Sequence, residues 1–277
     1  MRIATWNVNS LKARMERVEE WLADRAPDVL LMQETKLADE TAPEMPFRMA
    51  GYDLLRHGEG RWNGVAIASR VGIADVVTNF GDGPVRRSPG ADAIAEALEA
   101  EASEASADEA RMVSAVCGGV RVVSIYAPNG RAVDTPFYRA KLAWFERLAR
   151  WLRETQDPAG PLVIGGDFNV APEDADVYDM ADFAGATHVS APERAAVAAL
   201  RDWGLIDAYR LHHPEPGKFS WWDYRAGNFH KGLGMRIDHL YVPRSVAERC
   251  NAAEIDRDAR KGNLPSDHAP VYIDLAD

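Results

Sequence analysis

Short apolar segments recur along the chain and predict buried β-strands. Each segment is six to eight residues long and rich in valine and isoleucine, which favours a strand over a helix. The segments cover residues 2–8, 29–34, 64–69, 120–127, 161–167, 236–242 and 269–275.

Three longer segments have apolar residues at helical spacing. Ser10 is a candidate N-cap for the first helix, which we expect to end at Pro27. The second begins at Thr135, which is followed by proline at the first helical position. The third covers residues 192–203 and stops at Gly204.

The order of these elements predicts an α/β (α+β) fold. Strands and helices are mixed, but strict strand–helix–strand alternation is absent, and several strands follow one another through short turns. We therefore expect two packed, mainly antiparallel β-sheets flanked by helices. No linker divides the chain, so residues 1–277 are expected to form one domain. Residues 88–110 are Ala/Glu-rich and are expected to be an acidic surface insertion.

Composition excludes several classes of protein. With 47% hydrophobic and 27% charged residues, the chain is typical of globular proteins rather than of disordered or collagen-like ones. Cys117 and Cys250 are too few for a thiolate zinc site or a disulfide framework. No apolar run is long enough to span a membrane, and the first residues do not resemble a secretory signal. We expect a reduced, cytoplasmic protein without a membrane anchor.

The net charge of −11 argues against a nucleic-acid partner when taken alone. The acidic residues are unevenly spread, however. Residues 91–110 contain seven carboxylates and no Lys or Arg, and the rest of the chain has a charge of only −4. An enzyme that binds metal through carboxylates can be mildly acidic and still present a basic groove, so the charge leaves DNA open as a substrate.

Polar residues cluster where the predicted strands begin or end. Such clusters meet at one edge of a sheet sandwich, where loops on a rigid scaffold commonly build sites. Their carboxylates and amides are suited to phosphodiester hydrolysis, which needs a cation, a group that orients water and stabilisation of the leaving oxygen. The clusters are residues 6–9, 33–36, 126–130, 165–169, 236–239 and 266–268.

Taken in order, the motifs resemble the exonuclease III family of AP endonucleases, within the endonuclease/exonuclease/phosphatase superfamily. They span residues 6–271 and are WNVNSLKAR, LLMQETK, YAPNG, GDFN, SWWDYR, RIDHLYV and SDHAPV. The resemblance implies a four-layered α/β sandwich and dependence on Mg²⁺, with Mn²⁺ as a substitute. It also implies cleavage of double-stranded DNA 5′ to abasic sites, removal of 3′ blocking groups and 3′→5′ exonuclease activity.

The resemblance also implies a set of metal ligands. Glu34 is the first of them. Asn9 is a further candidate, although some relatives have Asp there, and the amide removes one negative charge. The complete set is Asn7, Glu34, Asp167, Asn169, Asp267 and His268.

The implied catalytic residues are Tyr126, Asp167, Asn169, Asp238 and His268. Asp167 would activate or orient the attacking water, and Asn169 would donate a hydrogen bond to the transition state. Asp238 would pair with His268 and keep the ring charged for contact with a phosphate oxygen. Tyr126 would donate to the phosphate or assist the leaving group.

Further residues are expected to contact DNA. Trp221 would line a pocket for the abasic sugar, together with Met235 and Ile237, because a baseless deoxyribose fits an aromatic wall. The backbone contacts would come from Asn129, Arg131, Arg225 and Arg236. The alternative for the arginines is an ordinary charged rim.

Each motif also has a simpler interpretation. Asp and Asn favour turns, a lone histidine is more often structural, and we expect Trp222 and His239 to be structural. Two other functions stay open: a phosphoesterase that acts on a small molecule or lipid headgroup, and a protein that binds damaged DNA without cutting it. We expect a monomer with no obligatory protein partner.

Overall fold

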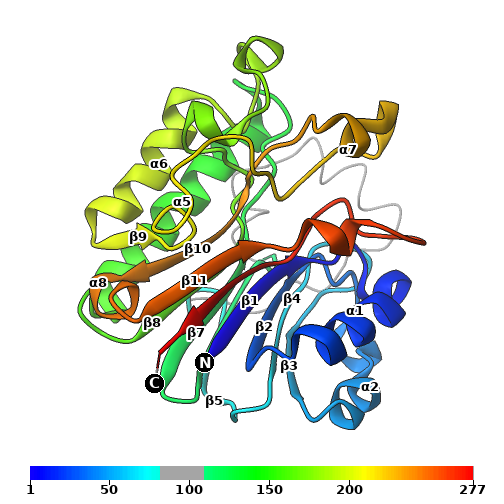
Figure 1. Ribbon diagram of the computed structural model, residues 1–277. Coiled ribbons are helices and arrows are strands. Elements are labelled where there is room, and N and C mark those ends of the chain that lie inside the picture. The colour runs from blue at the N-terminus through cyan, green and yellow to red at the C-terminus, as the bar shows by residue number, and fades with distance from the viewer. Residues whose placement is uncertain (82–108, 277) are drawn as a thin grey trace.

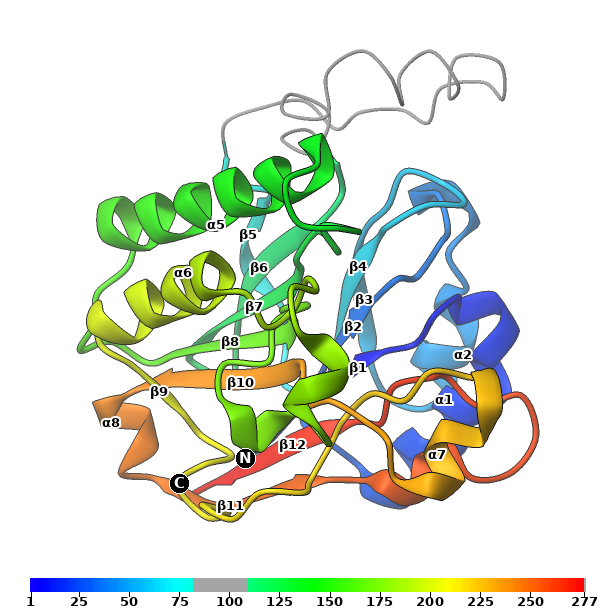
Figure 2. The same cartoon turned by 90° about the horizontal axis from the view of Figure 1, so that it is seen from above.

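The computed structural model describes residues 1–81 and 109–276. Apart from its last two residues, the acidic insertion predicted for 88–110 lies outside the described residues. Two β-sheets pack face to face, and helices cover both outer faces (Figures 1 and 2). The predicted α/β sandwich is therefore confirmed.

The first sheet has the strand order β11-β12-β1-β2-β4-β3. Strand β1 pairs in parallel with β2, and the other ladders of this sheet are antiparallel. The bounds are β1 Arg2–Asn7, β2 Val29–Gln33, β3 Asp53–His57, β4 Val65–Ser69, β11 Cys250–Ile255 and β12 Val271–Leu275.

The second sheet has the strand order β5-β6-β7-β8-β10-β9. Here β7 pairs in parallel with β8, and the remaining ladders are antiparallel. The bounds are β5 Ala74–Thr78, β6 Met112–Cys117, β7 Val120–Tyr126, β8 Leu162–Asp167, β9 Leu205–Asp207 and β10 Asp238–Pro243.

Helices cover each sheet on its outer face. Helices α1 (Leu11–Arg25) and α2 (Glu44–Met49) pack on the first sheet, and α5 (Pro136–Thr155) and α6 (Ala191–Asp202) pack on the second. Short helices α7 (Asn228–Lys231) and α8 (Arg244–Ala247) lie nearer the C-terminus in sequence. None of the described helices is long and apolar enough to cross a membrane.

The central core lies between the two sheets. A side chain on Gly165 of β8 would place its Cβ 2.6 Å from Leu240 and 2.7 Å from Leu31. A glycine is therefore required at position 165, between Leu240 on the neighbouring strand and Leu31 of the facing sheet. Strands β1 and β2 are connected through α1, and β7 and β8 through α5. These crossovers bring the carboxyl ends of the four strands to the same edge.

Helix ends follow the predicted signals. The Thr135 hydroxyl accepts a hydrogen bond from Tyr138 N at 3.2 Å and starts α5. Ala26 ends α1 in the left-handed conformation, immediately before Pro27. Helix α6 begins one residue earlier than predicted, after a capping box formed by Ser190 and Glu193.

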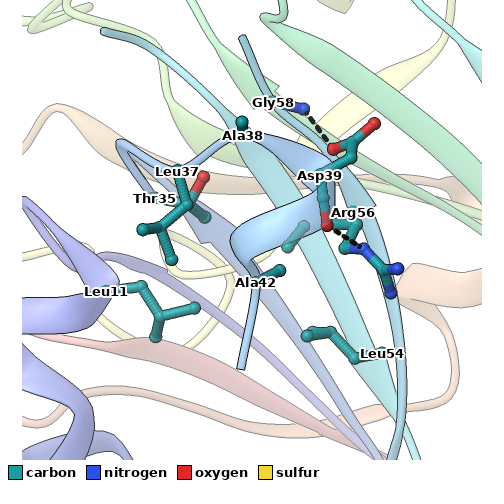
Figure 3. Close-up of a pocket in the computed structure, with 10 residues that line it drawn as sticks. Leu11, Thr35, Leu37, Ala38, Asp39, Ala42, Leu54, Arg56 and Gly58 are labelled. Carbon is teal, nitrogen blue, oxygen red and sulfur yellow. Dashed lines mark hydrogen bonds between the residues drawn. The ribbon is translucent and has the colours of Figure 1, made fainter. Parts of the chain in front are cut away.

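A small pocket lies between α1 and the first sheet (Figure 3). Leu11 and Leu54 supply apolar surface to it. The Asp39 carboxylate at its rim accepts a hydrogen bond from Gly58 N at 2.8 Å, and Arg56 Nε donates to the Asp39 carbonyl at 2.7 Å. The charged residues of the pocket are thus engaged in structural contacts, and the catalytic candidates gather elsewhere.

Candidate active site

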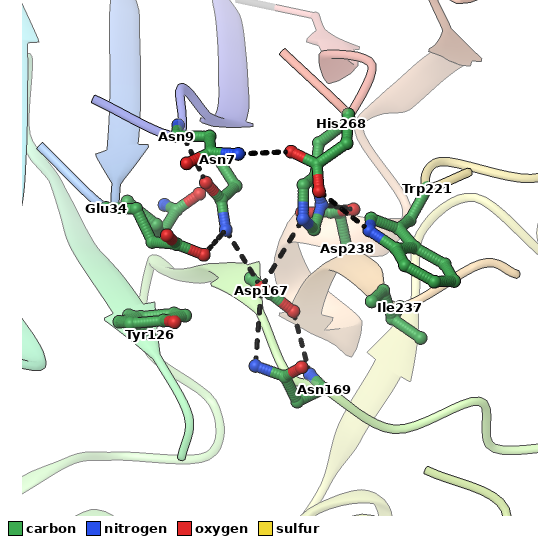
Figure 4. Close-up of polar contacts among 12 residues, drawn as sticks. Asn7, Asn9, Glu34, Tyr126, Asp167, Asn169, Trp221, Ile237, Asp238 and His268 are labelled. Carbon is green, nitrogen blue, oxygen red and sulfur yellow. Dashed lines mark hydrogen bonds and ion pairs between the residues drawn. The ribbon is translucent and has the colours of Figure 1, made fainter. Parts of the chain in front are cut away.

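The candidate site lies at the edge where four central strands end. Asn7 ends β1, Glu34 follows β2, Tyr126 ends β7 and Asp167 ends β8. Asp167 is paired across the sheet with Tyr126 on one side and with Asp238, the first residue of β10, on the other. Residues distant in sequence therefore meet because of the sheet register (Figure 4).

Asp167 lies at the centre of the polar cluster and is only 1% exposed. Its Oδ1 accepts from the backbone N–H of Asn169 at 2.8 Å, and its Oδ2 accepts from Asn7 Nδ2 at 3.0 Å. His268 Nε2 lies 3.9 Å from the same Oδ2. Burial raises the pKa of Asp167 to about 7, although the charge of His268 acts in the opposite direction.

His268 is held by a carboxylate on its other side. Its Nδ1 lies 2.8 Å from Asp238 Oδ2, which also accepts from the Ser220 hydroxyl at 2.7 Å. Burial opposes the charged ring, but Asp238, with Asp167 and Asp267, outweighs burial and raises the pKa of His268 to about 10. The ring is therefore an imidazolium at neutral pH, and both ring nitrogens are donors.

Oxygen atoms suited to a hard cation gather beside Asp167. Candidate ligand atoms of Glu34, Asp167 and His268 all lie within 4.8 Å of one another. The Lys36 ammonium donates to Asn9 Oδ1 at 2.6 Å and lies 2.8 Å from Glu34 Oε2, so these two oxygens already face a positive charge. This donor set fits Mg²⁺, which prefers carboxylate and carbonyl oxygens.

Asp267 lies on the far side of Asn9. Its Oδ1 accepts from Asn9 Nδ2 at 2.8 Å, and its Oδ2 accepts from Trp221 Nε1 at 3.1 Å. Burial opposes its charged form, but His268 and these hydrogen bonds outweigh burial and lower the pKa of Asp267. Asp267 thereby links the oxygen cluster to the aromatic wall.

Two asparagines and a tyrosine complete the arrangement. Asn169 Nδ2 donates to the carbonyl of Ala127 at 2.9 Å, and Asn169 Oδ1 accepts from Asn129 Nδ2 at 3.1 Å. Tyr126 is half-buried, and the Arg111 guanidinium lies over its ring, 4.8 Å from the centroid. Burial and the nearby Glu34 raise the pKa of Tyr126 well above its usual value, so the phenol keeps its proton.

The Endonuclease/Exonuclease/phosphatase family model matches residues 4–268 of the chain. The chain belongs to this family. Among its relatives, exodeoxyribonuclease III of Haemophilus influenzae is 32% identical over 286 residues, which cover 99% of this chain and all of that protein.

Solved structures of the family superimpose along the whole chain. An AP endonuclease from Archaeoglobus fulgidus has a TM-score of 0.88 and 33% identity, with 99% of each chain covered. A 3′ phosphatase from Neisseria, bound to a product DNA hairpin, has a TM-score of 0.87 and 36% identity, with 100% of this chain and 99% of that chain covered. The comparisons confirm the predicted resemblance, the fold and a metal-dependent phosphodiesterase of the exonuclease III type.

Most residues proposed for this family site do come together in the structure. The cluster around Asp167 contains Asn7, Asn9, Glu34, Tyr126, Asn169, Asp238 and His268, with Asp267 and Trp221 joined to it through Asn9. Trp222 and His239 are buried, as their predicted structural roles require.

Two residues predicted to contact DNA are placed differently. Arg236 is 1% exposed, and its guanidinium pairs with Asp176 at 2.7 Å and Asp207 at 2.8 Å. The prediction of a phosphate contact is wrong for Arg236, because buried carboxylates neutralise it. Met235 is also 1% exposed and packs in an apolar cluster with Ile237. It supports the aromatic wall from within and does not present surface to DNA.

The other candidate DNA contacts are exposed. Asn129 and Arg131 lie on the surface beyond β7, and the Arg131 guanidinium lies 3.6 Å from the centroid of the Phe137 ring. The Arg225 side chain is 88% exposed and pairs with Asp223. These positions leave all three side chains accessible to a phosphate.

Sequence reasoning missed several charged residues next to the site. Lys36 faces the oxygen cluster, and Arg111 covers Tyr126. Behind the site, Lys141 and Glu193 form a buried pair. Lys141 stands at helical spacing between apolar residues of α5, a pattern that predicts a buried lysine. His188 Nδ1 contacts the Asn169 carbonyl, and we found no sequence signal for it.

Proposed function

We propose that the chain is a Mg²⁺-dependent DNA-repair hydrolase that cleaves the phosphodiester 5′ to abasic sites. Removal of 3′ phosphates and other 3′ blocking groups, with 3′→5′ exonuclease activity, would use the same reaction centre. The proposal is carried by one observation: a buried carboxylate, Asp167, is flanked by a charged histidine, two amides and a cluster of cation-binding oxygens.

Mg²⁺ would be held chiefly by Glu34, and Mn²⁺ would replace it. Asn7 and Asn9 supply neutral oxygens nearby, and Asp167, Asn169 and Asp267 complete the proposed set. When bound, the ion would neutralise charge on the phosphoryl oxygens and make the phosphorus more open to attack. His268 is better suited to the phosphate than to the metal, because its charged ring has no free lone pair.

Each side chain of the site would have a separate role in the reaction. Asp167 orients the attacking water and accepts its proton, for which a pKa of about 7 is well matched. The His268 ring, fixed by Asp238, donates to a non-bridging phosphate oxygen, and Asn169 donates to the transition state. Tyr126 retains its proton and donates it in a hydrogen bond to the phosphate. The water oxygen bonds to phosphorus as the bond to the 3′ oxygen breaks, and the leaving oxygen takes up a proton from solvent, which gives a 3′-hydroxyl and a 5′-deoxyribose phosphate.

The proposed substrate is double-stranded DNA with an abasic site or a blocked 3′ end. Trp221, half-buried beside the site, would accept the baseless sugar, with Ile237, only 3% exposed, packed behind it. Asn129, Arg131 and Arg225 would contact backbone phosphates. The Archaeoglobus relative, an AP endonuclease, and the Neisseria relative, a 3′ phosphatase bound to a DNA hairpin, support both substrates.

We further propose that the protein works as a cytoplasmic monomer with one domain and no obligatory partner. Cys117 and Cys250 are both free thiols and both buried, which suits a reducing compartment.

A substrate comparison tests the proposal. Purified protein is given a duplex with one abasic-site analogue, a nicked duplex with a 3′ phosphate, and an inositol phosphate, each with Mg²⁺ and with EDTA. We expect Mg²⁺-dependent release of an extendable 3′-hydroxyl from DNA. Turnover of the inositol phosphate alone would favour the small-molecule phosphoesterase. Metal-independent binding of damaged DNA without turnover would favour the non-catalytic alternative.

A further inference from the structure

A fully buried ion pair lies behind the candidate site. Lys141 on α5 and Glu193 on α6 are in contact, and both side chains are 0% exposed. Burial lowers the pKa of Lys141, so the ammonium depends on its partners to stay charged. The groups that contact the Lys141 ammonium therefore indicate the role of the ion pair.

The other two contacts of the Lys141 ammonium go to the backbone of site residues. Nζ donates to the carbonyl of Asn169 at 2.7 Å and to the carbonyl of Asn129 at 3.3 Å. The side chains of these two asparagines are hydrogen-bonded to each other, and the N–H of Asn169 donates to Asp167. Lys141 thus binds the carbonyls of both asparagines, and the side chain of Asn169 lies between Asn129 and Asp167.

Glu193 fixes Lys141 from the opposite side. Its Oε1 accepts from the Thr187 hydroxyl at 2.7 Å and from His188 N at 2.9 Å, and its Oε2 accepts from Ser190. The Thr187 hydroxyl also lies 3.2 Å from the Asn129 carbonyl. The pair is therefore anchored to α5, to α6 and to the loop before α6.

The backbone around the pair is strained. Asn169 has φ 52° and His188 has φ 75°, both in the left-handed region that non-glycine residues rarely adopt. Such conformations cost about 1–3 kcal/mol each and persist only where the surroundings enforce them. Gly130 lies directly against Lys141, and a side chain at position 130 would be too close, because its Cβ would lie 2.9 Å from Lys141 Cδ.

Stability alone does not explain why two charges are buried here. Removing two ions from water is costly, and apolar residues of similar volume commonly give equal or greater stability. We propose that Lys141 and Glu193 are a positioning pair that holds Asn169 against Asp167 and Asn129 against Asn169. This inference rests on the proposed function of Asn169 in phosphodiester cleavage.

Replacing both Lys141 and Glu193 distinguishes a role in positioning the asparagines from a role in stabilising the fold. The single variant Lys141→Met leaves a buried carboxylate without its cation and is expected to melt well below wild type. The double variant Lys141→Met/Glu193→Leu removes both charges and is expected to melt above the single variant, although it also removes the acceptor of the α6 capping box. Its kcat on the duplex that wild type cleaves should nevertheless fall about 100-fold with KM little changed, as expected for misplaced catalytic groups.

A matched control uses an ion pair remote from the site. Arg2 and Asp274 pair at 2.7 Å between β1 and β12. The double variant Arg2→Met/Asp274→Leu should keep kcat within about twofold. If folded Lys141→Met/Glu193→Leu also keeps wild-type kcat, the positioning role is overturned.

Two further measurements show whether the pair acts through the asparagines. In an Asn129→Ala/Asn169→Ala background, the double replacement should cost less than about threefold in single-turnover rate. An undiminished 100-fold loss there would contradict the proposal. Hydrogen exchange at the Asn169 N–H is independent of catalysis, and it should accelerate in Lys141→Met/Glu193→Leu. If wild type cleaves no DNA, the proposed function fails, and unchanged exchange at Asn169 would separately overturn the positioning pair.

Discussion

Asp238→Asn is the variant that tests the role of the charged histidine. Asp238 is the first of the carboxylates that raise the pKa of His268 against the effect of burial, ahead of Asp167 and Asp267. A pKa raised from 6.5 to about 10 corresponds to roughly 5 kcal/mol in favour of the charged ring. In wild type this preference stabilises the fold fully below pH 6.5 and is lost as the pH rises through about 10.

Without the carboxylate, we expect the pKa of His268 to fall to its ordinary value or below. A ring with a pKa of 6.5 is charged in only about 3% of molecules at pH 8, which lowers the rate about 30-fold. Loss of a charged donor to the transition state typically costs about 100- to 1,000-fold. We therefore predict a loss of between 30- and 1,000-fold at pH 8.

The assay combines single-turnover DNA cleavage at pH 8 with NMR titration of the His268 ring in the metal-free protein. Ser220→Ala is the matched control, because it removes a neutral hydrogen bond to the same Asp238 oxygen but keeps its charge. Its rate should fall no more than about fivefold. A wild-type rate in Asp238→Asn, with a His268 pKa still near 10, would refute the reasoning.

Two further predictions concern the metal and the buried arginine. Because the pKa of Asp167 is about 7, Mg²⁺ should raise the melting temperature of wild type more at pH 8 than at pH 6, and Asp167→Asn should abolish this difference. An equal shift of the wild-type melting temperature at both pH values would contradict a role for this carboxylate in the metal site. Arg236→Met leaves Asp207 buried without its arginine and Asp176 with Arg210 as its remaining cation, and it should cost about 3–5 kcal/mol in urea unfolding. As a control, Arg225→Met at an exposed position should change the free energy of unfolding by less than about 0.5 kcal/mol. Similar losses of stability in both variants would argue against a stabilising network of Arg236 with Asp176 and Asp207.

The central strands were predictable because burial on both faces leaves a continuous apolar run. All seven predicted segments contain a strand of the structure, with ends shifted by up to two residues. The missed strands include edge strands such as β3 and β11, whose polar or small residues give no such run. Strand β6 is buried, but it begins directly after the acidic insertion, which hid its start.

The site residues that could be predicted are polar residues located at the ends of predicted strands. Asp167 and His268 belong to motifs that follow or precede a strand, and the sheet register brings them together. The burial of Arg236 had no local signal, because its partners Asp176 and Asp207 lie 60 and 29 residues away in sequence. Partners of buried charges are set by the tertiary fold rather than by neighbouring sequence.

Cleavage by Asp167→Asn tests the central claim most directly. The measurement is single-turnover nicking of a duplex with one abasic-site analogue, in Mg²⁺, with DNA binding and the melting temperature measured on the same samples. The replacement keeps the size of the side chain but removes the carboxylate that would accept the proton of water. The account predicts loss of cleavage with binding and fold retained. Near-wild-type cleavage by the folded variant would contradict it and would remove Asp167 from the mechanism.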